Sequence, residues 1–254
     1  MLVPGLVSVT FRALSVPEVV DLARSCGLWA VEWGGGVHVP LHDLPAARDA
    51  RNRCADAGLT VPSYGSRYRA GVTDRAEWSG VVATAAELGA PQVRVRAGDS
   101  GSAETSAEQR SVVVQAIRDA AERAEDYGVR IAVDYRRHTL TDTLESATRL
   151  YAEVGHGSVA PCWQPRGAQD VASAVEEVRT LLPRLTTAHV FSRNAADDRL
   201  SLAAREDLWR PVLAELARDG VDRYALLESV ADDSPERFRI DAAALLSWIT
   251  AVAP

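Results

Sequence analysis

The chain has 254 residues, 47% of them hydrophobic and 25% charged, a length and balance typical of one α/β barrel. Its formal net charge of −7 disfavours broad binding to nucleic acid, which depends on a surplus of basic side chains. The sequence contains no lysine, which excludes Schiff-base aldolases, pyridoxal phosphate enzymes and Walker-type phosphate loops, because each of them needs a lysine amine.

Short β-branched or apolar runs alternate with longer amphipathic stretches from one end of the chain to the other. The short runs predict strands at 6–11, 30–33, 60–65, 92–97, 130–135, 159–164, 186–191 and 223–230. The longer stretches repeat apolar residues every three or four positions, which is the period of one helix face. They predict helices at 16–26, 75–88, 106–127, 141–153, 170–182, 203–218 and 235–251.

Eight β-then-α units in this order predict a parallel sheet, which closes most simply into a (β/α)₈ TIM barrel. Capping residues such as Ser15 and Thr141 precede helices, and glycines such as Gly89 and Gly128 follow them. The competing fold is a doubly wound open sheet, but no dinucleotide-binding fingerprint follows the first strand. We therefore expect a single-domain α/β barrel over residues 1–254.

The N-terminal segment lacks a basic region and a small-residue cleavage site, so we expect it to be a strand and not a signal peptide. No apolar run reaches the roughly 18 residues that a membrane span needs. The cysteines Cys26, Cys54 and Cys162 lie far apart, which fits a reducing compartment. We expect a cytoplasmic protein that binds neither nucleic acid nor membrane. Whether it forms a homo-oligomer is left open by the sequence.

Polar or ionisable residues stand at the end of every predicted strand, where the working residues of these barrels lie. The strand interiors before them are mostly Val, Ile, Ala and Leu, so polarity begins abruptly. One such residue alone could be a solvated strand end or part of a buried salt bridge, but the set favours a functional site. The set is Arg12, Glu32, Tyr64, Arg96, Asp134, Gln164, His189 and Glu228.

Four members of this set, Asp134, Gln164, His189 and Glu228, come from four consecutive strands. Two carboxylates, an imidazole and an amide oxygen suit a divalent ion such as Mn, Mg, Co or Zn. Such an ion would hold adjacent oxygens of a sugar and stabilise the charge of an enediolate. The two carboxylates, Asp134 and Glu228, would then accept and donate the proton.

Several longer fragments run from the first strand to the last. They are 8–12 (SVTFR), 31–35 (VEWGG), 63–66 (SYGS), 138–143 (HTLTDT), 163–165 (WQP), 189–191 (HVF) and 226–228 (LLE). Together they resemble one branch of the xylose-isomerase-like family of TIM barrels. The resemblance implies a sugar isomerase or epimerase that holds a divalent metal with residues from strands five to eight. It also implies that the first and last of these ligands, here Asp134 and Glu228, are the acid/base pair.

Two positions depart from the pattern that this resemblance implies. Asp134 stands where the family usually has glutamate, which withdraws the carboxylate by about 1.5 Å, one carbon–carbon bond. Gln164 stands where aspartate is common, which removes one negative charge. Both changes weaken the expected metal site.

Further substrate contacts are expected from residues near the strand ends. Glu32, His38 and Tyr64 follow or end the second and third strands, and His138 follows the fifth. His38 could instead be an exposed loop residue, and His138 could cap the next helix.

Arg12 and Arg96 could clamp a carboxylate or phosphate through both guanidinium nitrogens. Arg96 could instead form a salt bridge with Asp134 or Glu32. Trp163 is expected to form an apolar wall for a sugar, although it could also fill the core.

The sequence therefore predicts a metal-dependent isomerase or epimerase of a small sugar-like substrate. A lyase that expels water from the enediolate of a keto-polyol or cyclic hydroxy-ketone needs the same groups. A barrel that has lost metal and catalysis and only binds a ligand is the third possibility. An abasic-site endonuclease is disfavoured, because its three-metal site needs more histidines than the five present and the chain is acidic.

Overall fold

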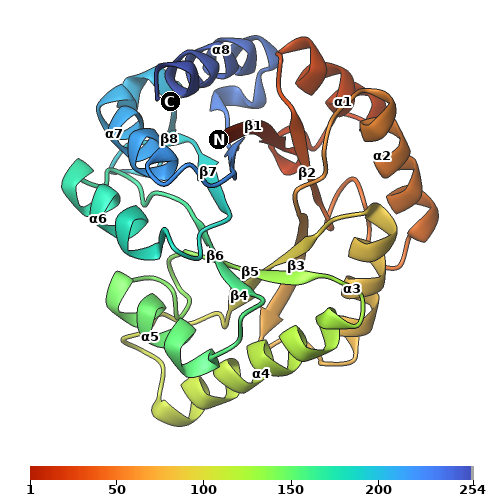
Figure 1. Cartoon of the computed structure of the whole chain (residues 1–254), viewed down its shortest axis with the longest axis vertical. Helices are drawn as coiled ribbons and strands as arrows, with labels where there is room; N and C mark the ends of the chain where they lie inside the picture. The colour runs from red at the N-terminus through yellow and green to blue at the C-terminus, as the bar shows by residue number, and fades with distance from the viewer. Residues whose placement is uncertain (253–254) are drawn as a thin grey trace. The chain divides into compact units, whose positions relative to one another are not determined.

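The computed structural model describes residues 1–252, which form a closed barrel of parallel strands with helices between them (Figure 1). The predicted (β/α)₈ fold is confirmed. The order around the barrel is β1-β10-β7-β6-β5-β4-β3-β2. The barrel strands are β1 (Leu2–Val7), β2 (Ala30–Gly34), β3 (Tyr64–Ala70), β4 (Gln92–Ala97), β5 (Arg130–Asp134), β6 (Val159–Trp163), β7 (Thr187–Val190) and β10 (Arg223–Leu227).

Short helices and an extra strand pair accompany the main elements. β8 (Ser192–Arg193) and β9 (Arg199–Leu200) pair antiparallel outside the barrel. The 3₁₀ helices are η1 (Ser8–Phe11), η2 (Leu202–Arg205) and η3 (Ala231–Asp233). The α-helices are α1 (Val16–Ser25), α2 (Leu44–Asp56), α3 (Glu77–Leu88), α4 (Ala107–Glu125), α5 (Leu144–Val154), α6 (Val171–Leu181), α7 (Glu206–Ala217) and α8 (Pro235–Val252).

Two strand predictions are wrong in position. The first strand begins at Leu2 and ends at Val7, and the predicted end at 8–11 is the helix η1. β3 begins at Tyr64, near the end of the predicted strand 60–65, because Pro62 has no backbone N–H to give to a ladder. Charged and buried residues then alternate along β3, so the strand contains no continuous apolar run.

The helix α2 lies outside the predicted helix ranges, although eight β-then-α units imply a helix there. Its buried side chains are Ala47, Ala50 and Cys54, which have helical spacing but present little apolar surface. A face made of such small residues gives a weak amphipathic signal.

Contacts within the chain group the residues into two compact units, called the first unit and the second unit below. The first unit comprises 1–32, 53–60 and the described residues from 163 onward. The second unit comprises 33–52 and 61–162. Each is described by itself.

The first unit packs β1 against β10 and β2 through a small apolar cluster of Val7, Ala30 and Leu226. Gly5 pairs with both Ala30 and Leu226, and a β-carbon on Gly5 would lie 2.5 Å from the Leu226 side chain and 2.6 Å from the Ala30 carbonyl oxygen. Only glycine therefore lets these strands approach so closely.

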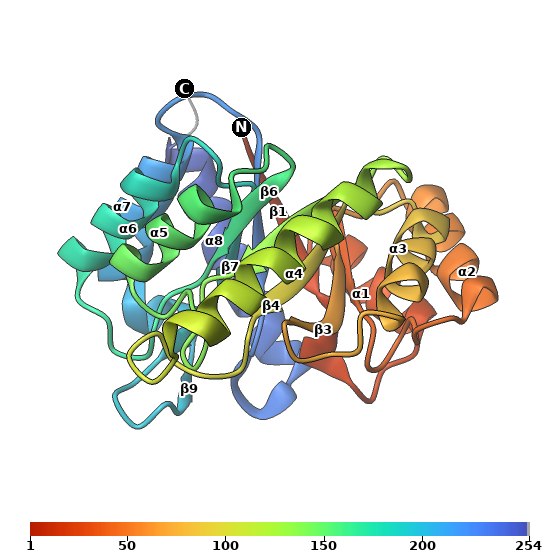
Figure 2. The ribbon, with the colours of Figure 1, turned by 90° about the horizontal axis from the view of Figure 1, so that it is seen from below.

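The second unit shows the alternation expected of barrel strands. On β4 and β5 the residues Val93, Val95, Ile131 and Val133 are at most 2% exposed. They form one face, and α4 packs against β3, β4 and β5, as Figure 2 shows for β3 and β4. The side chains at the alternate positions of β4 and β5 therefore point to the opposite face of the sheet.

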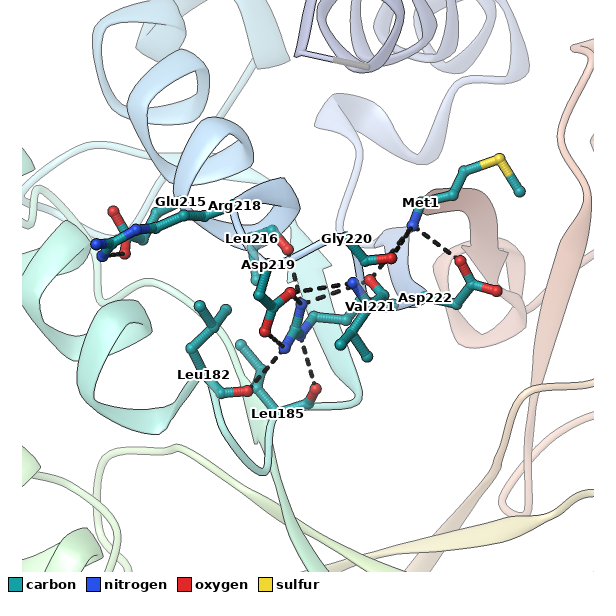
Figure 3. Close-up of polar contacts among 11 residues, drawn as sticks. Met1, Leu182, Leu185, Glu215, Leu216, Arg218, Asp219, Gly220, Val221 and Asp222 are labelled. Carbon is teal, nitrogen blue, oxygen red and sulfur yellow. Dashed lines mark hydrogen bonds and ion pairs between the residues drawn. The ribbon is translucent and has the colours of Figure 1, made fainter. Parts of the chain in front are cut away.

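A buried arginine anchors the start of β10. The Arg223 guanidinium is 2% exposed and donates to the carbonyl oxygens of Leu182, Leu185 and Leu216 at 2.8, 2.9 and 2.9 Å and to the Asp219 carboxylate at 2.6 and 2.8 Å. Figure 3 shows these acceptors converging from several turns. Where α6 and α7 end, backbone carbonyl groups have no N–H partner within the helix. Arg223 donates hydrogen bonds to these carbonyls, so its role is structural. Across residues 1–252 no helix combines the length and the apolar character that crossing a membrane requires.

Candidate functional site

The first unit brings together two carboxylates and one imidazole, called the carboxylate–imidazole cluster below: Glu32, His189 and Glu228. The His189 Nε2 lies 3.4 Å from a Glu32 carboxylate oxygen, and its Nδ1 lies 3.3 Å from a Glu228 oxygen. The side chains of Glu32 and His189 are each 1% exposed, whereas Glu228 is 19% exposed. A neutral imidazole can donate to only one carboxylate, whereas an imidazolium donates to both. The cluster can therefore store and pass a proton.

Strand pairing positions all three side chains. Glu32 on β2 is the register partner of Val7 on β1, and His189 on β7 is the partner of Leu226 on β10. Glu228 directly follows β10, and its backbone N–H donates to the Val190 carbonyl at 3.0 Å.

Backbone geometry holds Glu228 where the strand ends. The next residue, Ser229, has a φ of 58°, in the left-handed region that costs a non-glycine residue energy. Its N–H donates to the Thr10 hydroxyl at 3.3 Å. Such strained residues persist where the surroundings hold them, and they are frequent at functional sites.

The second unit holds a different charged group. Arg94 Nη1 donates to both carboxylate oxygens of Asp134, at 3.0 and 2.8 Å. Both side chains are largely buried, with 12% and 4% of their surfaces exposed. The expected salt bridge of Asp134 therefore exists, but its partner is Arg94 and not Arg96.

The expected metal shell does not fit these contacts. Asp134 has both oxygens committed to a guanidinium, and His189 has both nitrogens directed at carboxylates. Within the described part of the chain, no three His, Cys, Asp or Glu side chains are arranged to hold a metal ion. The neutral Gln164, partly exposed after β6, cannot supply the missing charge. The residues present therefore do not fit the Asp134, Gln164, His189 and Glu228 set that a metal would need.

Trp163 does not form the expected sugar-facing wall. Its ring is fully buried, its Nε1 donates to Glu177 on α6 at 3.0 Å, and it packs edge-on against Trp209 of α7. The side chain therefore lies between the strand and its helices.

Tyr64 begins β3 and does not end it. Its hydroxyl donates to the Val39 carbonyl at 3.0 Å, and burial raises the pKa of Tyr64. The ring is 1% exposed and pairs in register with Trp33 and Val93, which again places it on the helix side.

The remaining predicted residues lie in loops or near strand ends. His38 is 8% exposed, and its ring contacts Trp33 edge-on at 5.7 Å. His138 is exposed in the loop after β5 with a φ of 57°, and Arg12 is exposed at the end of η1. Arg96 is half-buried near the end of β4.

Arg94 was not predicted, because it stands two positions before Arg96, which was taken as the polar residue near the end of that strand. The available signal was its spacing from Arg96, since residues two apart share one face of a strand.

The sequence model of the xylose isomerase-like TIM barrel family matches residues 20–249. The chain belongs to this family. A search of curated proteins finds no match.

Solved structures with the same fold include members that act on sugars and one that removes water. The probable 3-DHS dehydratase AsbF of petrobactin synthesis from Bacillus anthracis is 18% identical, with a TM-score of 0.76 and coverage of 97% of this chain and 99% of that one. A D-psicose 3-epimerase is 14% identical, with a TM-score of 0.76 and 98% coverage of both chains. An L-ribulose 3-epimerase is 15% identical, with a TM-score of 0.77 and coverage of 99% and 96%. At these identities the likeness concerns the fold alone.

Proposed function

We propose that this member of the family is an enzyme that isomerises or epimerises a small sugar or sugar acid through an enediolate. The observation that carries the proposal is the carboxylate–imidazole cluster, in which Glu228 is the partly exposed carboxylate. It stands at the carboxyl end of a barrel strand, where the active sites of such barrels lie.

In this proposal the Glu228 carboxylate removes the proton from a carbon next to a carbonyl. The electron pair of that C–H bond becomes the enediolate, and Glu228 holds the proton. Return of this proton by Glu228 to the neighbouring carbon, while the hydroxyl proton of that carbon moves to the former carbonyl oxygen, isomerises the substrate. Epimerisation instead needs a proton delivered to the opposite face of the same carbon by a second donor such as water, while Glu228 keeps the first proton. His189 holds the Glu228 carboxylate in place through Nδ1, and Glu32 fixes the ring from Nε2.

Asp134 is not a member of the acid/base pair in this mechanism. It was expected to be the second member of the acid/base pair, but both of its oxygens are bonded to Arg94. The proposal therefore assigns proton transfer to Glu228. A lyase that expels hydroxide from the same enediolate would use the same base, and its product would lack one water.

The test is deuterium uptake from D₂O into the C–H bonds of a panel of aldoses, ketoses and sugar acids. We expect the wild type to exchange at least one compound and Glu228→Gln to lose the exchange. Glu122→Gln is the matched control, because Glu122 is an exposed carboxylate on α4. Absence of exchange across the panel, or undiminished exchange in Glu228→Gln, would contradict the proposal. A mass loss of one water would identify the lyase.

A further inference from the structure

Three arginines and Asp134 lie near Arg96 in the second unit, and we call Arg69, Arg94, Arg96 and Arg136 the arginine cluster. Arg94 and Arg96 are two positions apart on β4, so their side chains leave the same face of the strand. Arg69 on β3 is the register partner of Arg96. On the other side, Val95 pairs with Val133, which places Arg96 beside Asp134 at the next step of the register.

The positive charge of this cluster is only partly balanced. Asp134 is bonded to Arg94, and Asp99 lies 3.9 Å from Arg69, where both side chains are about half exposed. Within residues 1–252 the guanidinium groups of Arg96 and Arg136 make no hydrogen bond and no ion pair. Neither guanidinium therefore has a direct acceptor within the described residues.

The lack of an acceptor costs the most free energy at Arg96, because its guanidinium is half-buried. Burial and the charge of Arg136 lower the pKa of the Arg96 guanidinium, and only Asp134 acts in the opposite direction among its stronger neighbours. A guanidinium removed from water without an acceptor loses hydration that nothing replaces. An anion whose oxygens accept its fork of N–H donors would restore that loss.

We propose that the arginine cluster binds the anionic group of a small sugar-like molecule, with Arg96 as the central donor and Arg136 beside it. The ligand of this cluster is then a sugar acid or a sugar phosphate and not a neutral sugar. This inference rests on the proposed function only in taking the ligand to be sugar-like.

The experiment measures binding by isothermal titration calorimetry with three probes that share a six-carbon polyol frame. D-gluconate carries a carboxylate, D-glucose 6-phosphate carries a phosphate, and D-glucose carries no charge. We expect saturable binding of at least one anion and none of glucose, and the stronger anion identifies the group. Arg96→Gln should weaken that binding roughly tenfold or more, as the loss of a charge-assisted hydrogen bond does. Arg136→Gln, at an exposed position, should weaken it as well.

Arg130→Gln is the matched control, since it removes the same charge from the opposite end of β5, where Arg130 is exposed. It should leave the affinity unchanged. The melting temperature without ligand gives a second readout. Arg96→Gln should keep or raise it, because the substitution removes a half-buried cation that has no partner.

The proposal is overturned if neither anion binds, if glucose binds as well as the anions, or if Arg130→Gln weakens binding as much as Arg96→Gln. A lower melting temperature with unchanged affinity in Arg96→Gln would show a structural role. Anion binding without deuterium exchange would refute the proposed reaction but support this site. Deuterium exchange on neutral sugars without anion binding would support the proposed reaction and refute this site.

Discussion

Arg94 donates from a single nitrogen to both carboxylate oxygens of Asp134, at 3.0 and 2.8 Å. A guanidinium thus neutralises Asp134, which the resemblance to sugar isomerases implied to be a metal ligand. The pair supplies charge balance inside the protein without an ion. It also commits both Asp134 oxygens to a partner inside the protein.

The first prediction concerns the stability of this pair. Arg94→Leu leaves a carboxylate that is only 4% exposed without its main counter-charge, and we expect a loss of about 3–5 kcal/mol in the free energy of unfolding. The double variant Arg94→Leu/Asp134→Leu should recover much of this loss, because it buries neither charge. Urea denaturation of both variants measures the difference. Equal stability of the single and double variants would contradict the prediction.

The second prediction concerns metal affinity. Gln164→Asp adds the acidic residue common in the family, but Arg94 still holds Asp134, so we expect no saturable binding of Mn²⁺ at millimolar concentration in the wild type or in this variant. Calorimetric titration with MnCl₂ checks both. Stoichiometric binding by the wild type that is lost in His189→Gln would refute it.

The third prediction separates chemistry from folding at Glu228. Glu228→Gln keeps the size of the side chain but cannot accept a proton at neutral pH, so the rate of exchange or turnover should fall by roughly 10²–10⁴-fold. The melting temperature should change by only a few degrees, because the side chain is partly exposed at the end of β10. A large fall in melting temperature would instead assign Glu228 to the fold.

The fourth prediction concerns acid stability at the other end of β10. The hydrogen bond from Arg223 lowers the pKa of Asp219 from 3.8 to about 2. A carboxyl group with a lowered pKa in the folded state stabilises the protein above its unfolded value of about 3.9, and this contribution disappears as the pH falls toward 2. Asp219→Asn should therefore lower the melting temperature at neutral pH, and the difference from wild type should shrink below about pH 4. Asp126→Asn, at an exposed position, should show no such trend.

The sequence by itself determined the barrel and most of its strands. Alternating apolar residues such as Val93 and Val95 show which side of a strand faces the helices, because successive side chains point to opposite faces. Glu32, His189 and Glu228 were identified because they stand where the apolar pattern of a strand stops. The observed β3 lies later than its predicted range, because arginines interrupt its buried side chains. The helix α2 lies outside the predicted ranges, because its buried side chains are small.

Only the tertiary structure decided how these side chains pair. Glu32 and His189 are 157 positions apart, and Asp134 pairs with Arg94 and not with Arg96, two positions further along the same strand. Trp163 looks like part of the site in sequence but lies against α6 and α7. The physical reason is that a strand pattern specifies the face and depth of a residue, whereas an ion pair depends on the register and separation of two strands. Those quantities arise only when the barrel closes.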